Sequence, residues 1–277
     1  TYVEEKSILA GDRDWAAVPL ASLDGEVMFL GSSAPPWGNY TIPSSGTAVT
    51  LGPEYGDEFR TFSFFGGDSY NFAPVNYQRQ PNERWMLTFD GEQRLLEDET
   101  LGEVNVFAEA QYINRQNEQA LAEVPLAPLV FFGFSDAPYS ADNFYNPFGE
   151  DISDWRRRMV EGGPRIRDFE AQTKRIVLGL NGEFEDWSWE AYYQYGDVNL
   201  ETHFGDLYNL QRVANAVGPT TGSPAGGDLQ CVNDPTNCVP LDVFGQNSVT
   251  QEMLDYVTFT TNESAGSDQE IFALNIS

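Results

Sequence analysis

The most concentrated group of ligand-binding side chains is the run Trp155, Arg156, Arg157 and Arg158. Arginine guanidinium groups bind carboxylate or sulfate groups through paired hydrogen bonds, so this run could hold such a group of a ligand. The same arginines could instead pair with acidic neighbours and order the chain around them. Those neighbours are Glu150, Asp151, Asp154 and Glu161. Residues 155–158 are therefore the candidate substrate-binding residues, with local pairing as the alternative.

Carboxylates are far more numerous than cations, because 43 Asp and Glu residues accompany 15 Lys and Arg, and the formal net charge is −28. The acidic segments 12–14, 97–99 and 150–154 could bind Ca²⁺ through oxygen ligands. No twelve-residue EF-hand pattern is present, so we expect solvated acidic surface there. The charge balance argues against nucleic-acid binding, which needs clustered cations. It equally argues against adsorption to anionic lipid.

Residues for catalysis are scarce despite the many carboxylates. Paired Asp and Glu side chains are the device of glycosidases, but a chain this acidic contains such pairs by chance. His203 is the only histidine, and the patterns G-x-S-x-G, H-E-x-x-H and Walker A do not occur. We therefore expect no enzymatic activity, no cofactor and no catalytic metal.

Cys231 and Cys238 are the only cysteines and lie in a stretch rich in Gly, Pro, Asn and Asp. No histidine or further cysteine nearby could complete a zinc site. The spacing predicts a local disulfide, which would imply an oxidising compartment. Two unpaired thiols in a loop are the alternative.

Five stretches alternate between apolar and polar residues with the period of two that is typical of β-strands, and residues 1–10 could be the end of a sixth strand. Along 187–195, for example, Trp187, Trp189, Ala191, Tyr193 and Tyr195 share one face. The predicted strands are 1–10, 84–96, 103–118, 169–184, 187–203 and 267–277. The longest apolar run, 124–134, is interrupted by proline and glycine and is shorter than the ~20 residues of a membrane helix.

The connections between these strands have two very different lengths. Segments 97–102 and 185–186 are tight turns, whereas 11–82, 119–168 and 205–256 are loops of roughly 50 residues or more. Short turns at one end and long loops at the other are typical of outer-membrane β-barrels, whose strands alternate lipid-facing and lumen-facing residues. A soluble β-sandwich would explain the alternation but not the two loop sizes.

Within the loops, the sequence predicts three short helices. One should begin near Asp151 and Ser153 and end at the glycine pair 162–163, and the others should cover 207–217 and 249–256. Loop aromatics could stack on sugar rings or pack inside the loops: Trp37, Tyr40, Tyr55, Phe64, Phe65, Phe131, Phe132, Tyr139 and Tyr145. Charged residues on the polar faces of the strands could line a transport path or pair with each other: Arg84, Asp90, Glu109, Arg175 and Glu190.

Several loop segments resemble the barrel region of TonB-dependent outer-membrane receptors of Gram-negative bacteria. The most specific is 146–165 (NPFGEDISDWRRRMVEGGPR), accompanied by 210–219 (LQRVANAVGP), 238–245 (CVPLDVFG) and 253–259 (MLDYVTF). Segment 10–14 (AGDRD) is similar to an early loop of the same family. The resemblance implies a 22-stranded barrel filled by an N-terminal plug, which imports a ligand with energy delivered through TonB.

Together these patterns predict an all-β chain, an antiparallel transmembrane β-barrel fragment that covers residues 1–277. It would contribute about six strands and three long extracellular loops bearing short helices. The plug, the TonB box and the closing strand would lie outside it, since six strands are fewer than the ~8 a barrel needs. The expected function is outer-membrane import of a scarce solute, such as a siderophore or an oligosaccharide, with the TonB complex acting through the plug. The alternative is a secreted soluble β-domain that binds or cleaves polysaccharide.

Overall fold

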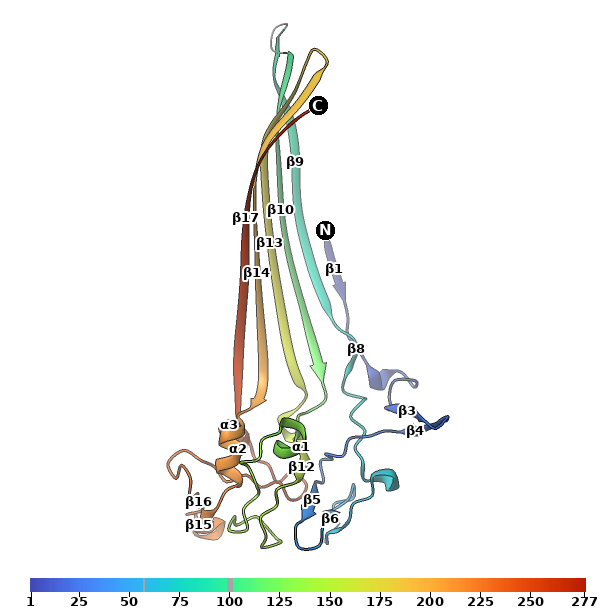
Figure 1. Cartoon of the computed structure of the whole chain (residues 1–277), viewed down its shortest axis with the longest axis vertical. Coiled ribbons are helices and arrows are strands. Elements are labelled where there is room, and N and C mark those ends of the chain that lie inside the picture. The colour runs from blue at the N-terminus through green and yellow to red at the C-terminus, as the bar shows by residue number, and fades with distance from the viewer. Residues whose placement is uncertain (57, 99–101) are drawn as a thin grey trace.

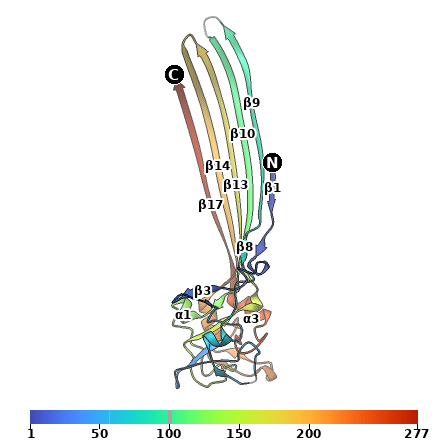
Figure 2. The same cartoon turned by 90° about the vertical axis from the view of Figure 1, so that its right-hand side faces the viewer.

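The computed structural model describes residues 1–56, 58–98 and 102–277 and consists of two parts (Figure 1). One is a long, twisted antiparallel sheet. The other is formed by segments 6–81, 122–164 and 209–257, which connect the strands at one end of the sheet and which we call the loop assembly. Figure 2 shows that the long strands extend well away from the loop assembly.

The long sheet has six strands in the order β1-β9-β10-β13-β14-β17, so each strand pairs with its neighbour along the chain. They are β1 (Tyr2–Glu5), β9 (Asn82–Asp98), β10 (Gly102–Leu121), β13 (Arg165–Phe184), β14 (Trp187–Tyr208) and β17 (Thr258–Ile276). The all-β prediction and all six predicted strands are confirmed. The sheet is open in the described residues, with β1 and β17 at its edges.

The strand ends differ from the prediction where alternation is weak. β1 ends at Glu5, and the remainder of 1–10 forms β2 (Ile8–Leu9) and a helical turn at Ala10–Asp12. β17 begins at Thr258 rather than at 267, because pairing with β14 continues from Trp189↔Ile276 to Tyr208↔Thr258. Hydrogen bonds to a neighbouring strand thus extend this strand through a polar stretch that shows no alternation.

The two tight turns lie at the far end of the sheet. Phe184 pairs with Trp187, so residues 185–186 form a two-residue hairpin turn, and Glu185 has a positive φ of 54°. At the other turn Gly102 pairs with Asp98, while residues 99–101 lie outside the described part of the chain. Phe107, which interrupts the alternation of β10, lies directly opposite Gly179, where the missing side chain leaves room for the phenyl ring.

The loop assembly contains a second, five-stranded sheet in the order β11-β12-β5-β6-β7. Its strands are β11 (Pro125–Leu126), β12 (Trp155–Arg158), β5 (Asn39–Ile42), β6 (Thr47–Thr50) and β7 (Arg60–Thr61). Three smaller pairs are β2 with β8 (Tyr77–Arg79), β3 (Leu20–Leu23) with β4 (Glu26–Phe29), and β15 (Thr220–Thr221) with β16 (Gln230–Cys231). Because β5 and β12 come from different loops, this sheet joins the first loop to the second.

Two of the three predicted helices are confirmed, α2 (Leu210–Val217) and α3 (Gln251–Val257). The Asn209 side chain caps α2 by accepting hydrogen bonds from the backbone of Gln211 and Arg212, and Thr250 caps α3 by accepting from Met253. A further helix, α1 (Pro128–Phe132), follows β11, and single helical turns occur at Phe64–Asp68, Val160–Gly162 and Pro224–Gly226.

The helix predicted after Asp151 is wrong, because Trp155–Arg158 is strand β12. Its pairing partner is β5, where Trp155 lies opposite Tyr40. A partner so distant in the chain leaves no signal in the local sequence. Along the described residues, no helix combines the length and the apolar character needed to cross a membrane.

Candidate functional site

One face of the long sheet, which we call the apolar face, is covered with exposed hydrophobic side chains. Leu178 is 57% exposed, Leu274 is 68% exposed and Phe272 is 79% exposed. The register places such residues side by side, as in the row Ala108, Leu178, Tyr193 and Phe272. No second layer packs against this face within the part of the chain that the structure describes (Figure 2).

The apolar face occupies only the half of the sheet near the tight turns. On β13 it runs from Ile176 to Phe184, about nine residues, which corresponds to ~30 Å along the strand. Closer to the loop assembly the same face becomes polar. There Lys174 forms an ion pair with Asp197 at 3.6 Å.

Aromatic residues mark both borders of this apolar zone. Trp85 and Tyr112 lie on the border nearer the loop assembly, with ring centroids 4.9 Å apart. Trp187 and Trp189 lie at the other border, beside the tight turn of β13 and β14. The apolar surface is thus a band with aromatic edges on both sides.

The opposite face of the sheet, which we call the polar face, carries hydrogen-bonded charged and amide side chains. Arg175 pairs with Glu109 at 2.7 Å and donates to Gln194 at 2.9 Å. Of the five charged residues predicted on this face, Glu109 and Arg175 therefore bind each other, and Glu190 accepts a hydrogen bond from Asn275. Arg84 and Asp90 form no ion pair among the described residues.

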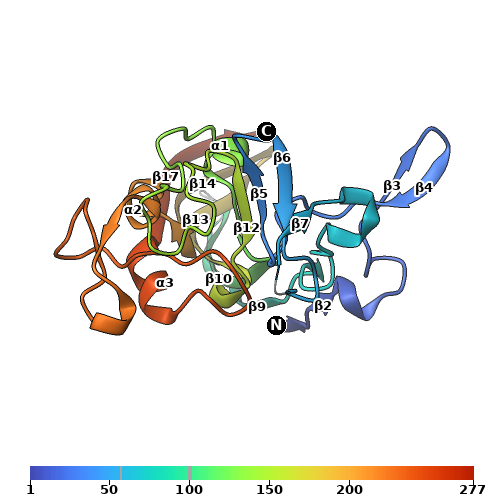
Figure 3. The same cartoon turned by 90° about the horizontal axis from the view of Figure 1, so that it is seen from below.

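The three long loops share one hydrophobic core, which makes the loop assembly a folded unit (Figure 3). Tyr40 from the first loop, Trp155 from the second and Val243 from the third are all buried within it. Its other fully or largely buried members are Leu126, Ala137, Tyr139, Ile152, Met159, Val213, Ala216, Val217, Leu241, Val249, Met253, Leu254, Tyr256 and Val257.

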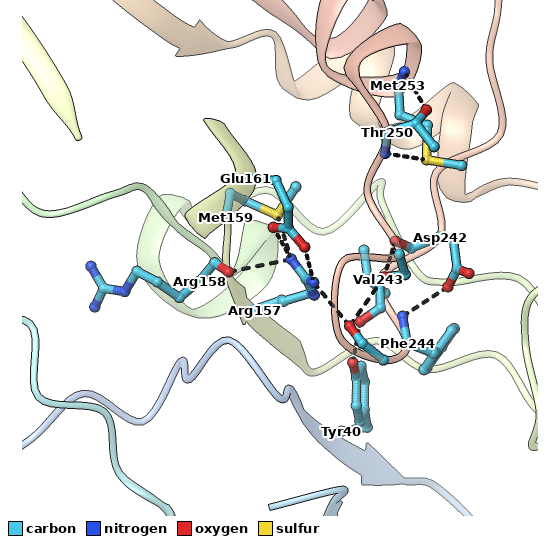
Figure 4. Close-up of polar contacts among 12 residues, drawn as sticks. Tyr40, Arg157, Arg158, Met159, Glu161, Asp242, Val243, Phe244, Thr250 and Met253 are labelled. Carbon is cyan, nitrogen blue, oxygen red and sulfur yellow. Dashed lines mark hydrogen bonds and ion pairs between the residues drawn. The ribbon is translucent and has the colours of Figure 1, made fainter. Parts of the chain in front are cut away.

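Segment 241–245 of the third loop is hydrogen-bonded to both of the other loops (Figure 4). Tyr40 donates its hydroxyl to the carbonyl of Val243 at 2.5 Å, and Tyr139 donates to the carbonyl of Leu241 at 2.6 Å. Burial raises the pKa of Tyr40 above its usual range, so the hydroxyl remains a donor. Arg157 donates to the carbonyl of Gly245 at 3.1 Å.

Arg157 lies inside this core with a side chain that is 0% exposed, paired with Glu161 (Figure 4). The two guanidinium Nη atoms contact the two carboxylate oxygens at 2.8 and 2.5 Å. Burial lowers the pKa of Arg157, but the hydrogen bonds and charge of Glu161 outweigh burial, so the pKa is raised overall. This is a buried bidentate ion pair, which is costly to break because either partner alone would be an uncompensated buried charge.

Asp242 lies beside this ion pair, and the pKa of its carboxyl group is raised. Burial raises its pKa to about 6, although the backbone N–H of Phe244 donates to its carboxylate and Arg157 contributes a favourable charge. The hydrogen bond from Phe244 measures 2.9 Å. A carboxyl group in the loop core therefore changes charge in mildly acidic solution.

The structure separates the four candidate residues 155–158. Trp155 is buried in the loop core and donates to the carbonyl of Ala137 at 2.9 Å, and Arg157 pairs with Glu161 as described. Arg156 pairs with Asp154 at 2.7 Å. The alternative of local pairing thus accounts for two of the arginines.

Arg158 differs from its neighbours because it has no carboxylate partner among the described residues. It is 4% exposed and donates to the carbonyl of Glu123 at 2.7 Å. Its Nε atom is buried and has no hydrogen-bond partner in the ranges that the structure describes. That residues 155–158 bind a substrate stays a prediction.

The other residues singled out in the sequence are distributed over the loop assembly. Tyr40 and Tyr139 are buried in the core and cannot stack on a ligand, whereas Phe65 and Phe132 are exposed. Cys231 and Cys238 form a disulfide, with Cα atoms 5.9 Å apart. In the described ranges, no three His, Cys, Asp or Glu side chains gather into a metal-binding group.

Comparison with known proteins adds no relative. No protein-family model matches the chain, and neither a curated protein nor a solved structure is similar to it. The resemblance to TonB-dependent receptors therefore stays a prediction that depends on the loop segments alone.

Proposed function

We propose that this chain forms part of the wall of an outer-membrane β-barrel, in a TonB-dependent receptor that imports a scarce solute. The apolar face would contact lipid, the polar face would line the interior, and the loop assembly would lie outside the cell. The observation that carries this proposal is the uncovered apolar band with its aromatic edges.

The size of the band supports a lipid environment. About nine residues per strand, tilted by about 45°, span ~21 Å, close to the ~25 Å apolar band of outer-membrane barrels. Aromatic girdles at both borders are likewise typical of these barrels. Soluble monomers, in contrast, rarely expose contiguous apolar patches larger than a few hundred Å².

The backbone of the sheet supports the same interpretation. In hydrocarbon every N–H and C=O group must be hydrogen-bonded, and here β10, β13 and β14 are paired along both edges. Among the described strands, β17 has one neighbour, β14. The proposal therefore requires further strands beside β17 and β9 to close the barrel.

The proposal is tested by asking whether the tryptophans at the edge of the band touch lipid. The full chain is reconstituted in vesicles whose acyl chains carry bromine, which quenches tryptophan fluorescence on contact. We expect Trp187→Phe/Trp189→Phe to weaken the quenching, with Trp85 at the other border accounting for what remains, whereas the matched control Trp155→Phe keeps it, because Trp155 lies in the loop core.

The contrary result is equally clear. The proposal would be contradicted if the full chain were monodisperse and cooperatively folded in buffer without detergent. Its tryptophan fluorescence would then not be quenched by brominated lipid. That outcome would favour the secreted soluble β-domain that binds or cleaves polysaccharide.

A further inference from the structure

In the half of the sheet that adjoins the loop assembly, the polar face carries four arginines together with the acidic residues Glu5 and Glu263. On the polar face Arg84 lies directly opposite Arg115, and Arg165 and Arg167 lie further along β13 towards the loops. The other face of the same region is acidic, with Glu4, Glu83, Glu118, Asp168, Glu170 and Glu201. Alternation along the strands keeps these two sets on opposite sides of the sheet.

Arg158 joins the arginines of the polar face from the loop assembly. Its Nη1 atom donates to the carbonyl of Glu123 at 2.7 Å, and the Nε atom of Arg165 donates to the carbonyl of Ala122 at 2.7 Å. The two guanidinium groups thus bind consecutive carbonyls directly after the end of β10. We call Arg84, Arg115, Arg158, Arg165 and Arg167 the arginine surface.

No member of the arginine surface forms an ion pair with a carboxylate of the described residues. Among the described residues, the Nε atoms of Arg158 and Arg167, like that of Arg157, are buried without a hydrogen-bond partner. Burial lowers the pKa of Arg158 to about 10, because the charge of Glu123 offsets burial only in part and the positive charge of Arg165 lowers the pKa further. The pKa of Arg165, which lies outside the apolar band, is lowered by burial as well.

Two of these guanidinium groups each lie over two aromatic rings, Arg158 over Tyr70 and Phe72 and Arg167 over Phe169 and Phe204. Arg167 lies 3.8 Å from the ring centroid of Phe204, and Arg158 lies 5.4 Å from that of Tyr70. Stacking on a ring face leaves the in-plane N–H donors free for a planar anion. Like charges directly opposite each other, as in Arg84 and Arg115, destabilise a sheet unless an anion compensates them.

We propose that the arginine surface binds an anionic solute that carries carboxylate, phosphate or sulfate groups, on the polar face beneath the loop assembly. The inference rests on the proposed function, in which this face borders the path of the solute. The chain has 43 acidic residues. In its described part none of them lies within ion-pair distance of these five arginines. The compensating anion therefore comes from outside the chain.

The first test uses the unaltered full chain in detergent and the arginine reagent phenylglyoxal, with modification read by mass spectrometry. We expect citrate, and to a smaller extent inorganic phosphate, to slow the modification of Arg115, Arg165 and Arg167 severalfold at low ionic strength. Arg94, which pairs with Glu97 near the opposite end of the sheet, is the internal control and should not be protected. The neutral sugar maltose should protect none of them.

The second test measures citrate affinity by calorimetry. Each hydrogen bond to a charged group that is lost costs about a factor of ten or more in affinity, so Arg165→Gln/Arg167→Gln should bind citrate at least ~10-fold more weakly. The matched variant Arg94→Gln removes one positive charge far from the surface and should bind normally. Affinity should fall as salt rises.

Three outcomes would overturn the inference: no protection by citrate or phosphate, an equal loss of affinity in Arg94→Gln, or protection only by micelles of lipopolysaccharide. The last would assign the arginines to lipid phosphate rather than to a free solute. Because both tests are performed in detergent, they give a result whether or not the chain enters a bilayer. Failure of the proposed function is detected separately by the brominated-lipid measurement.

Discussion

The hydroxyl of Tyr40 donates a 2.5 Å hydrogen bond to the carbonyl of Val243, which lies 203 residues further along the chain. Both residues are fully buried, so water cannot replace this bond. It joins the first loop to the third, and β12 brings the second loop beside Tyr40. The loops therefore stabilise one another as a single folded unit.

Replacing Tyr40 by phenylalanine should weaken this unit. Tyr40→Phe leaves the carbonyl of Val243 buried without a donor, which costs about 1–3 kcal/mol. We expect faster proteolysis within all three loops, measured by limited digestion of the full chain. Tyr2→Phe, at an exposed tyrosine of β1, is the control and should digest at the normal rate. Cleavage confined to the first loop would contradict the shared core.

Breaking the buried pair of Arg157 and Glu161 should lower the unfolding free energy far more than breaking an exposed pair. Arg157→Met leaves Glu161 charged and without its partner, so we expect a loss of about 3–5 kcal/mol in unfolding free energy, measured with denaturant. Arg157→Met/Glu161→Met should recover a large part of that loss. Arg94→Gln breaks the exposed pair with Glu97 and should cost at most about 1 kcal/mol. Equal losses in the two single variants would contradict the buried pairing.

The raised pKa of Asp242 should make the loop assembly less stable as the solution becomes less acidic. The folded state, with a pKa of about 6, binds more protons than the unfolded state, whose pKa is ~3.9. Stability from this group is therefore complete below pH ~4 and falls by about 2 kcal/mol as pH rises to about 6. The unfolding free energy should be measured as a function of pH. In Asp242→Asn this decrease should be absent, and the asparagine side chain still accepts a hydrogen bond from Phe244.

Asp154 provides a control of opposite sign. Burial would raise its pKa, but the hydrogen bonds and charge of Arg156 outweigh burial and lower it. The stability that Asp154 contributes is present above the unfolded pKa and is lost as pH falls through the folded pKa. Asp154→Asn should therefore remove only the loss of unfolding free energy at acidic pH. An Asp242→Asn variant with an unchanged pH profile would exclude the assignment to Asp242.

A charge on the apolar face should prevent membrane insertion, whereas the same charge on the polar face should not. Leu178→Arg places a cation on the proposed lipid-facing surface, at a cost of about 2–4 kcal/mol near the bilayer centre. Asn181→Arg is the matched control, because Asn181 lies on the other face and donates to Glu92. We expect folded protein in the outer-membrane fraction for Asn181→Arg only. Equal yields would argue that the apolar face does not contact lipid.

The long strands were predictable because each is amphipathic by itself. Leu178 and Tyr193 alternate with polar residues along their own strands, and that pattern is local. The same alternation placed Arg84 on the polar face, although only the paired register shows that Arg115 lies directly opposite it. Helix α2 was predictable as well, since Leu210, Ala214 and Val217 recur at helical spacing before Gly218, whereas its cap Asn209 is seen only in the structure.

The sequence by itself determined the six strands, their apolar and polar faces and the two lengths of their connections, because side-chain period and turn residues are local properties. Only the tertiary structure decided that Trp155–Arg158 is a strand and that Arg157 is buried with Glu161. It also decided that the arginine surface has no carboxylate partner in the described part of the chain. These features depend on partners such as Tyr40, far away in the chain. Hydrogen bonding and burial depend on the residues that surround a side chain in space, and the local sequence does not specify those residues.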